Sequence, residues 1–200
     1  MLVSDFGVST FKYFMFYKML DLTGALGGDK YLLLNTSYDL GFLYNYMQEV
    51  AKVNEKYGDY GRISLSIHCE QPEIINAATQ YVREHESGNP LKDYSDARPA
   101  FSERMAIKEV EVLCGKTDCP VNLLHLSSID AIEAGKEAVA KNPKLNILLE
   151  GTLHHLGLSN DTKYGKLGKV NPPIREREHV EGLWKAVIDG HIKTVVSDSA

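Results

Sequence analysis

Five polar residues stand at or near the C-terminal ends of five separate apolar runs in this sequence of 200 residues. They are Lys12, His68, His125, Glu150 and Asp198. If the runs are parallel strands joined by helices, their carboxyl ends meet on one side of a sheet or barrel, where (β/α) barrels carry their active sites. A lysine, two histidines and an aspartate that meet there would form a metal-ligand set with the chemistry of a binuclear hydrolase.

Each of these residues also has a purely structural interpretation. A lysine inside an aromatic run, such as Lys12, can extend its ammonium group to water from the edge of a sheet. A single histidine at a strand end, such as His68 or His125, is most often a hydrogen-bonded structural residue. The combination with Asp198 favours a metal site, because imidazole and carboxylate are the ligands that catalytic zinc prefers. A bound metal lowers the pKa of water to about 7, and a nearby aspartate can carry the proton to a leaving nitrogen.

Other polar residues admit two interpretations as well. His154 and His155 are adjacent, and since neighbours in an extended chain point to opposite sides, we interpret both as structural. Asn171 opens an Asn-Pro-Pro turn and either contacts a polar substrate or only shapes the turn. Tyr17 is a core residue by pattern alone. The sequence contains no GxGxxG, GxSxG or phosphate-binding glycine loop ending in Gly-Lys-Ser/Thr, so neither nucleotide binding nor a serine hydrolase is supported.

The runs that position these residues alternate with helical patterns. We expect strands at 10–17, 62–70, 120–126, 145–151 and 192–198. We expect helices at 38–57, 72–88, 101–117, 127–143 and 175–191, with Ser102 and Ser127 or Ser128 as caps, and loops at 89–100 and after Leu153. This alternation predicts an α/β fold with a parallel sheet and right-handed crossovers.

The strand count predicts a partial (β/α)8 TIM-type barrel of about five parallel strands. The first element is expected to be a strand with no helix before it, and five strands cannot close a barrel of eight. We therefore expect residues 1–200 to be a fragment, the C-terminal portion of a barrel domain whose first strands are absent. The alternative is an open half-barrel that needs a partner chain.

Composition narrows the function classes. The net charge of −5, without a basic stripe, argues against a nucleic-acid partner and against an anionic membrane surface. No apolar stretch approaches the roughly 18–20 residues of a membrane span, and the N-terminus lacks the features of a signal peptide. Cys69, Cys114 and Cys119 have neither disulfide-framework nor zinc-finger spacing, which favours a reducing, cytoplasmic location.

Seven blocks, taken in order, resemble one family. They are GVSTFKYFMFYK, IHCE, ARPAFSE, PVNLLHLSS, EGTLHHLGLS, KVNPPIRE and VVSDSA. The chain is similar to the cyclic amidohydrolases, which include hydantoinase, dihydropyrimidinase, dihydroorotase and allantoinase. The resemblance implies a (β/α)8 barrel with a small flanking β-domain, a homo-oligomer (dimer or tetramer), and hydrolysis of a small cyclic amide or ureide. It also implies two divalent metal ions, usually zinc, bridged by an N6-carboxylated lysine and a hydroxide.

The resemblance assigns roles to individual residues. The metal ligands that it implies are Lys12, carrying the carboxyl group, His68, His125 and Asp198. Asp198 also matches the general base that later acts as an acid. Tyr17 matches the tyrosine that stabilises the oxyanion, and Asn171 matches a substrate-contacting residue.

Departures from the family leave alternatives open. The His-x-His pair that binds the other metal is absent and would precede Met1, so we expect this fragment alone to be inactive. Ser199 stands where the family usually has histidine. The block FKYFMFYK favours hydantoinase or dihydropyrimidinase, whereas HHLGLS and KVNPPIR favour dihydroorotase. A non-catalytic scaffold relative with the same fold is a further alternative.

Overall fold

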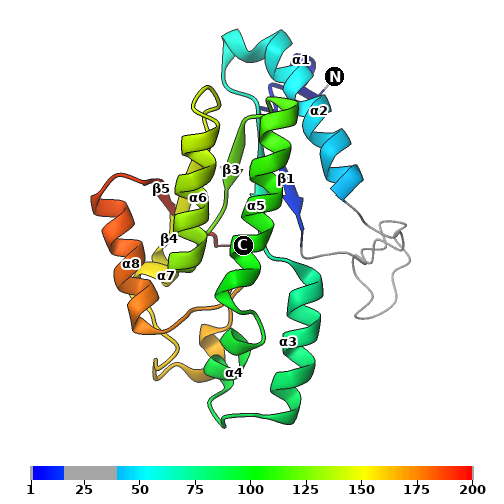
Figure 1. Ribbon diagram of the computed structural model, residues 1–200. Coiled ribbons are helices and arrows are strands. Elements are labelled where there is room, and N and C mark those ends of the chain that lie inside the picture. The colour runs from blue at the N-terminus through cyan, green and yellow to red at the C-terminus, as the bar shows by residue number, and fades with distance from the viewer. Residues whose placement is uncertain (1, 16–39, 200) are drawn as a thin grey trace.

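The sheet has the predicted architecture. The computed structural model describes residues 2–15 and 40–199 (Figure 1). Within them, five parallel strands lie side by side in sequence order, and helices connect successive strands. The strands are β1 (Thr10–Phe14), β2 (Ser64–His68), β3 (Val121–Leu123), β4 (Leu148–Thr152) and β5 (Ile192–Val196). The expected partial (β/α) barrel is therefore confirmed.

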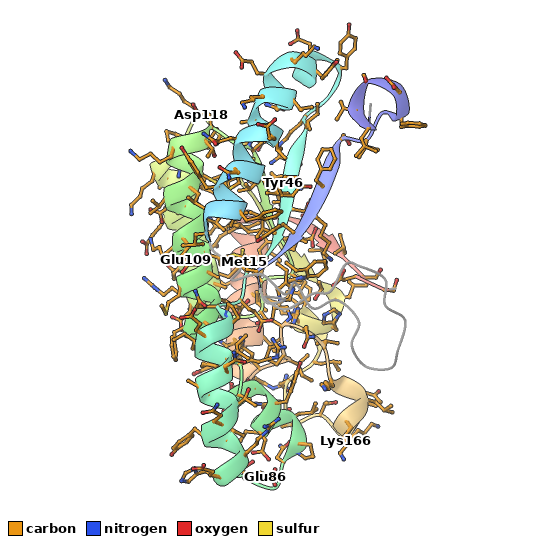
Figure 2. The ribbon with its side chains drawn as sticks, turned by 90° about the vertical axis from the view of Figure 1, so that its right-hand side faces the viewer. Met15, Tyr46, Glu86, Glu109, Asp118 and Lys166 are labelled. Carbon is orange, nitrogen blue, oxygen red and sulfur yellow. The ribbon has the colours of Figure 1, made fainter. Side chains whose placement is uncertain are left out.

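The longer helices lie on one side of this sheet. The helices are α1 (Leu2–Phe6), α2 (Leu40–Tyr57), α3 (Pro72–Glu84), α4 (Pro90–Asp96), α5 (Ala100–Thr117), α6 (Ile129–Lys141), α7 (Leu153–Gly157) and α8 (Arg177–Ile188). Two 3₁₀ turns, η1 (Gly58–Tyr60) and η2 (Gly165–Gly168), complete the elements. Figure 2 shows α2 and α5 to one side of the strands, and Figure 1 shows α3 and α4 extending beyond the carboxyl ends of the strands. No helix of the described ranges is long and apolar enough to cross a membrane.

Alternation along the strands separates an apolar face from a polar face. Leu65, Ile67 and Leu123 belong to the buried core that also includes Ile107 and Val110 of α5. The intervening residues of each strand point the other way, because successive side chains of a strand alternate. We call this second face the polar face, and its residues include Lys12, Ser64, Ser66, His68 and Asn122. Register places Lys12 opposite Ser66 and Ser66 opposite Asn122, so these side chains lie in one row.

Arg62 fastens the amino end of the sheet, opposite the predicted site. Its Nη1 atom donates to Oδ1 of Asn122 at 2.7 Å, and its Nη2 atom donates to the carbonyl of Val121 at 2.9 Å. The Nη2 atom also donates to the carbonyl of Asn146, just before β4. One side chain therefore joins the amino ends of three neighbouring strands.

Two expectations about local structure were wrong. The segment 89–100 is not a loop throughout, because α4 forms within it. The side chain of Asn89 accepts from the backbone N–H groups of Leu91 and Lys92 at 3.0 and 3.2 Å, and Pro90 occupies the first turn. Asparagine at the cap followed by proline is a helix-start signal that the loop-like composition hid. A short helix, α1, also precedes the first strand, contrary to expectation.

The predicted helix caps had mixed outcomes. Ser128 caps α6, since its Oγ accepts from the backbone N–H of Ala131 at 3.1 Å. Ser102 is not a cap, because α5 begins at Ala100 and Pro99 occupies the capping position. Proline fixes its own φ at a value that suits a helix boundary, and the backbone N–H of Ser102 donates to the carbonyl of Pro99 at 2.8 Å. The segment after Leu153 likewise begins with a helix, α7, which the side chain of Thr152 caps.

Candidate active site

A buried pair of histidines lies at the carboxyl ends of β2 and β3. The Nδ1 atom of His68 is 3.0 Å from the Nε2 atom of His125, and each side chain is only 2% exposed. The two rings meet edge to face, with centroids 4.6 Å apart. Two nitrogens bound to one tetrahedral zinc ion would be about 3.3 Å apart, so this spacing suits a shared metal ligand pair.

Glu70 fixes the outer side of His68. One carboxylate oxygen, Oε2, lies 2.7 Å from Nε2 of His68 and 2.7 Å from Nη1 of Arg98. Burial opposes ionisation of Glu70, but hydrogen bonds and charges from His68 and Arg98 lower the pKa of this carboxyl below its ordinary value. Because an ionised carboxylate only accepts, Nε2 of His68 donates to Glu70, and in a neutral imidazole with its proton there Nδ1 would carry the lone pair that faces His125.

His125 is held in its neutral form. Burial lowers its pKa well below the ordinary value, and the nearby cation Lys12 lowers it further. Its Nδ1 atom is buried and has no hydrogen-bond partner among the described residues. Its φ of 37° and the φ of 49° at Asp198 are left-handed. Such conformations cost non-glycine residues about 1 kcal/mol or more and concentrate at functional sites.

Glu150 is half-buried at β4 and is affected by the charges of Lys12 and Asp198. The Nζ atom of Lys12 lies 4.6 Å from the ring centroid of Phe14, whose register partner is His68. Burial raises the pKa of Glu150, the charge of Asp198 raises it further, and Lys12 lowers it. Oε1 of Glu150 also lies 3.4 Å from the backbone nitrogen of His125.

The Asn-Pro-Pro turn is anchored from two sides. The hydroxyl of Tyr94 donates to Oδ1 of Asn171, which is exposed. Nε2 of His155 lies 3.0 Å from the carbonyl of Pro172, and Nδ1 of His155 lies 2.7 Å from the hydroxyl of Thr152. Burial lowers the pKa of His155 to about 3, so this histidine is neutral and fastens the turn to β4. Tyr17, the predicted oxyanion residue, lies outside the described residues.

Sequence reasoning missed the polar residues behind the histidines. Arg175 donates from Nε to Oγ of Ser127 at 2.8 Å and from Nη1 to the carbonyl of Arg98 at 2.9 Å. Its Nη2 atom pairs with Oε2 of Glu103 at 2.9 Å, and both side chains are 2% exposed. Glu103, Arg98 and Arg175 lie in the blocks ARPAFSE and KVNPPIRE, which the sequence analysis used only as evidence of the family resemblance. Nothing in their spacing indicated that they meet.

The residues fit a metal in part. No cluster of three or more His, Cys, Asp and Glu side chains that could hold a metal ion occurs in the described ranges. The two histidines have a spacing that suits a shared metal ion, and His125 is held neutral, as a metal ligand must be. A carboxyl group on Lys12 would add an oxygen donor on the same face, and a carboxylate is a ligand type that divalent metals accept.

Fold and site together define a class: a partial (β/α) barrel with paired histidines at the carboxyl ends of adjacent strands. No family model matches the chain. The chain is 32% identical over 192 residues to the probable allantoinase 2 of Dictyostelium discoideum, covering 90% of this chain and 37% of that protein. It is 31% identical over 146 residues to an allantoinase of Escherichia coli O139:H28, covering 72% and 31%.

A solved structure has the same fold. The L-hydantoinase (dihydropyrimidinase) from Arthrobacter aurescens matches 94% of this chain and 37% of its own, with a TM-score of 0.74 and 24% identity. The chain belongs to the cyclic amidohydrolase family. It spans about a third of the length of the curated relatives that it matches.

Proposed function

We propose that the protein hydrolyses the ring amide of a small cyclic ureide or amide. The observation that carries this proposal is the buried His68–His125 pair at the carboxyl ends of β2 and β3. A ureide is favoured because the two curated relatives described above are named as allantoinases. Residues 1–200 would supply the later strands of a (β/α)8 barrel domain, and the other strands would complete the site.

The proposed cofactor is a pair of divalent metal ions, with zinc the first choice. Lys12, as its N6-carboxylated form, His68, His125 and Asp198 would be the ligands. The metals would polarise the ring carbonyl and lower the pKa of water. Carboxylation of Lys12 would turn a cation into an anion, which removes a positive charge from the neighbourhood of His125.

The remaining roles belong to the side chains. Asp198 would take a proton from water and deliver it to the leaving ring nitrogen. Tyr17 would donate a hydrogen bond to the oxygen on which negative charge develops. Asn171 would contact the substrate through its Nδ2 donors, because its Oδ1 already accepts from Tyr94. We also propose a homo-oligomer in the cytoplasm; the three free cysteines support a reducing compartment.

The proposal is tested on the complete protein purified with zinc. Metal content is measured per subunit, and ring opening is followed with allantoin, hydantoin, dihydrouracil and dihydroorotate. We expect about two metals per subunit and turnover that His68→Asn and His125→Asn abolish. Preference for dihydroorotate would instead favour dihydroorotase. A folded protein with neither metal nor turnover would be a non-catalytic relative, and the proposal would fail.

A further inference from the structure

A carboxylate and a guanidinium lie directly behind His68, on the side away from His125. We propose that Glu70 and Arg98 are positioning residues that fix the tautomer and ring orientation of His68. This inference rests on the proposed function only in one respect, namely that the two imidazoles bind a metal ion. The hydrogen bonds that set the tautomer are present in the protein itself.

Glu70 is placed to select one tautomer of His68. Its side chain is 0% exposed, and Oε2 lies 2.7 Å from Nε2 of His68. A neutral imidazole carries its proton on one nitrogen and a lone pair on the other. A carboxylate at Nε2 draws the proton there and leaves Nδ1 as an acceptor or a metal ligand. Nδ1 is the atom that faces His125, so the selected tautomer is the one that can bind in the site.

Arg98 keeps Glu70 in this position. Its Nη1 atom donates to the same Oε2 at 2.7 Å, and its side chain is 5% exposed. The guanidinium stacks over the ring of Tyr94, with 5.3 Å between Cζ and the ring centroid. The carbonyl of Arg98 accepts from Arg175, which is itself paired with Glu103. Arg98 is therefore held at its backbone and at its side chain.

Burying the ion pair of Glu70 and Arg98 costs desolvation free energy, and stability alone does not require such a pair. Replacing a buried ion pair by apolar residues of similar volume is often neutral or stabilising. Retaining charge directly behind His68 is explained if the charge orients that ring. Carboxylates that accept from the second nitrogen of a metal-binding histidine typically change metal affinity by 10–100-fold when mutated.

The test compares Glu70→Gln with Glu111→Gln in the complete protein. The second variant is matched, because it neutralises another buried glutamate, whose partners Lys108 and Lys141 do not contact His68 or Arg98. In ¹⁵N-histidine-labelled apoprotein, NMR reports which nitrogen of His68 is protonated. We expect the Nε2–H form in the native protein and in Glu111→Gln, and a mixture or the Nδ1–H form in Glu70→Gln. A glutamine amide can donate to Nε2, which favours the opposite tautomer.

Metal affinity gives a second readout. Zinc binding measured by chelator competition should weaken by about 10–100-fold in Glu70→Gln and by less than about threefold in Glu111→Gln. An unchanged tautomer in folded Glu70→Gln would overturn the inference. If that variant does not fold, Glu70→Asp replaces it, since its shorter carboxylate should withdraw from Nε2 and weaken zinc binding similarly; unchanged zinc affinity there would also overturn it. A native protein that binds no zinc refutes the proposed function, while the tautomer comparison still decides this inference.

Discussion

The Nδ1 atom of His68 and the Nε2 atom of His125 lie 3.0 Å apart although 57 residues separate them in the chain. The sheet creates this proximity, because β2 and β3 are parallel neighbours, and Ile67 opposite Leu123 brings their carboxyl ends to the same edge. Neighbouring strands lie about 4.8 Å apart, so side chains at adjacent strand ends need little further adjustment to touch.

Lys12 is expected to be essential for hydrolysis. Lys12→Ala in the complete protein should reduce turnover to the background rate, since the proposed bridging carboxylate is lost. Short carboxylic acids such as acetate or propionate should restore part of the activity by occupying the space. Lys52→Ala, which changes an exposed lysine of α2, serves as the control. Full turnover in Lys12→Ala would show that Lys12 is not the bridge.

Stability should fall in mild acid because His155 is buried in its neutral form. Its pKa is about 3 when folded and about 6.5 when unfolded, so between these values the unfolded chain binds more protons. The free energy of unfolding should therefore decrease as the pH falls below about 6.5, by roughly 1.4 kcal/mol per pH unit for this histidine. This contribution is complete above pH ~6.5.

Urea unfolding between pH 7.5 and 5 measures the effect. The variant His155→Gln should show a pH slope that is smaller by about one proton, whatever its absolute stability. Parallel slopes in the two proteins would mean that His155 does not couple folding to proton binding.

Arg62 should stabilise the fold without contributing to the site. Arg62→Met removes charged hydrogen bonds to Asn122 and to the carbonyl of Val121, and should cost about 2 kcal/mol of unfolding free energy. Zinc affinity should be unchanged. Lys52→Met removes an exposed ion pair with Glu49 and should change stability by less than about 0.5 kcal/mol. Equal losses in both variants would contradict this account of the amino end.

The buried pair of Glu103 and Arg175 should behave as one unit. Arg175→Met leaves the Glu103 carboxylate buried without its charged partner and should cost about 3–5 kcal/mol. The double variant Glu103→Gln, Arg175→Met should lose less than the sum of the single losses, by about 1–3 kcal/mol. Chemical denaturation of the native protein, the two single variants and the double variant gives the free energies of this double-mutant cycle. Additive losses would mean that the two side chains do not interact energetically.

Residues on regular elements were predictable from the sequence, whereas their supporting partners were not. The alternation around His68 and the apolar run before His125 indicate strand ends, and parallel strands bring such ends together. Glu70 and Arg98 are separated by 28 residues, and no periodicity links a strand end to a short helix. Glu70 and Arg98 meet because of the positions of the loop after β2 and the end of α4, which the sequence pattern does not predict. Tyr17 lies outside the described residues, and its role stays a prediction.

The location of the Arg62 contacts matters for protein engineering and for evolution. Its contacts join three strands at the amino end, whereas the histidines stand at the opposite end. Substitutions around Arg62 and substitutions around Asn171 can therefore be selected separately. The stability that the Arg62 contacts contribute would offset destabilising substitutions at the end that carries the histidines. Libraries that vary the Asn-Pro-Pro turn should consequently tolerate more substitutions when the Arg62 contacts are kept.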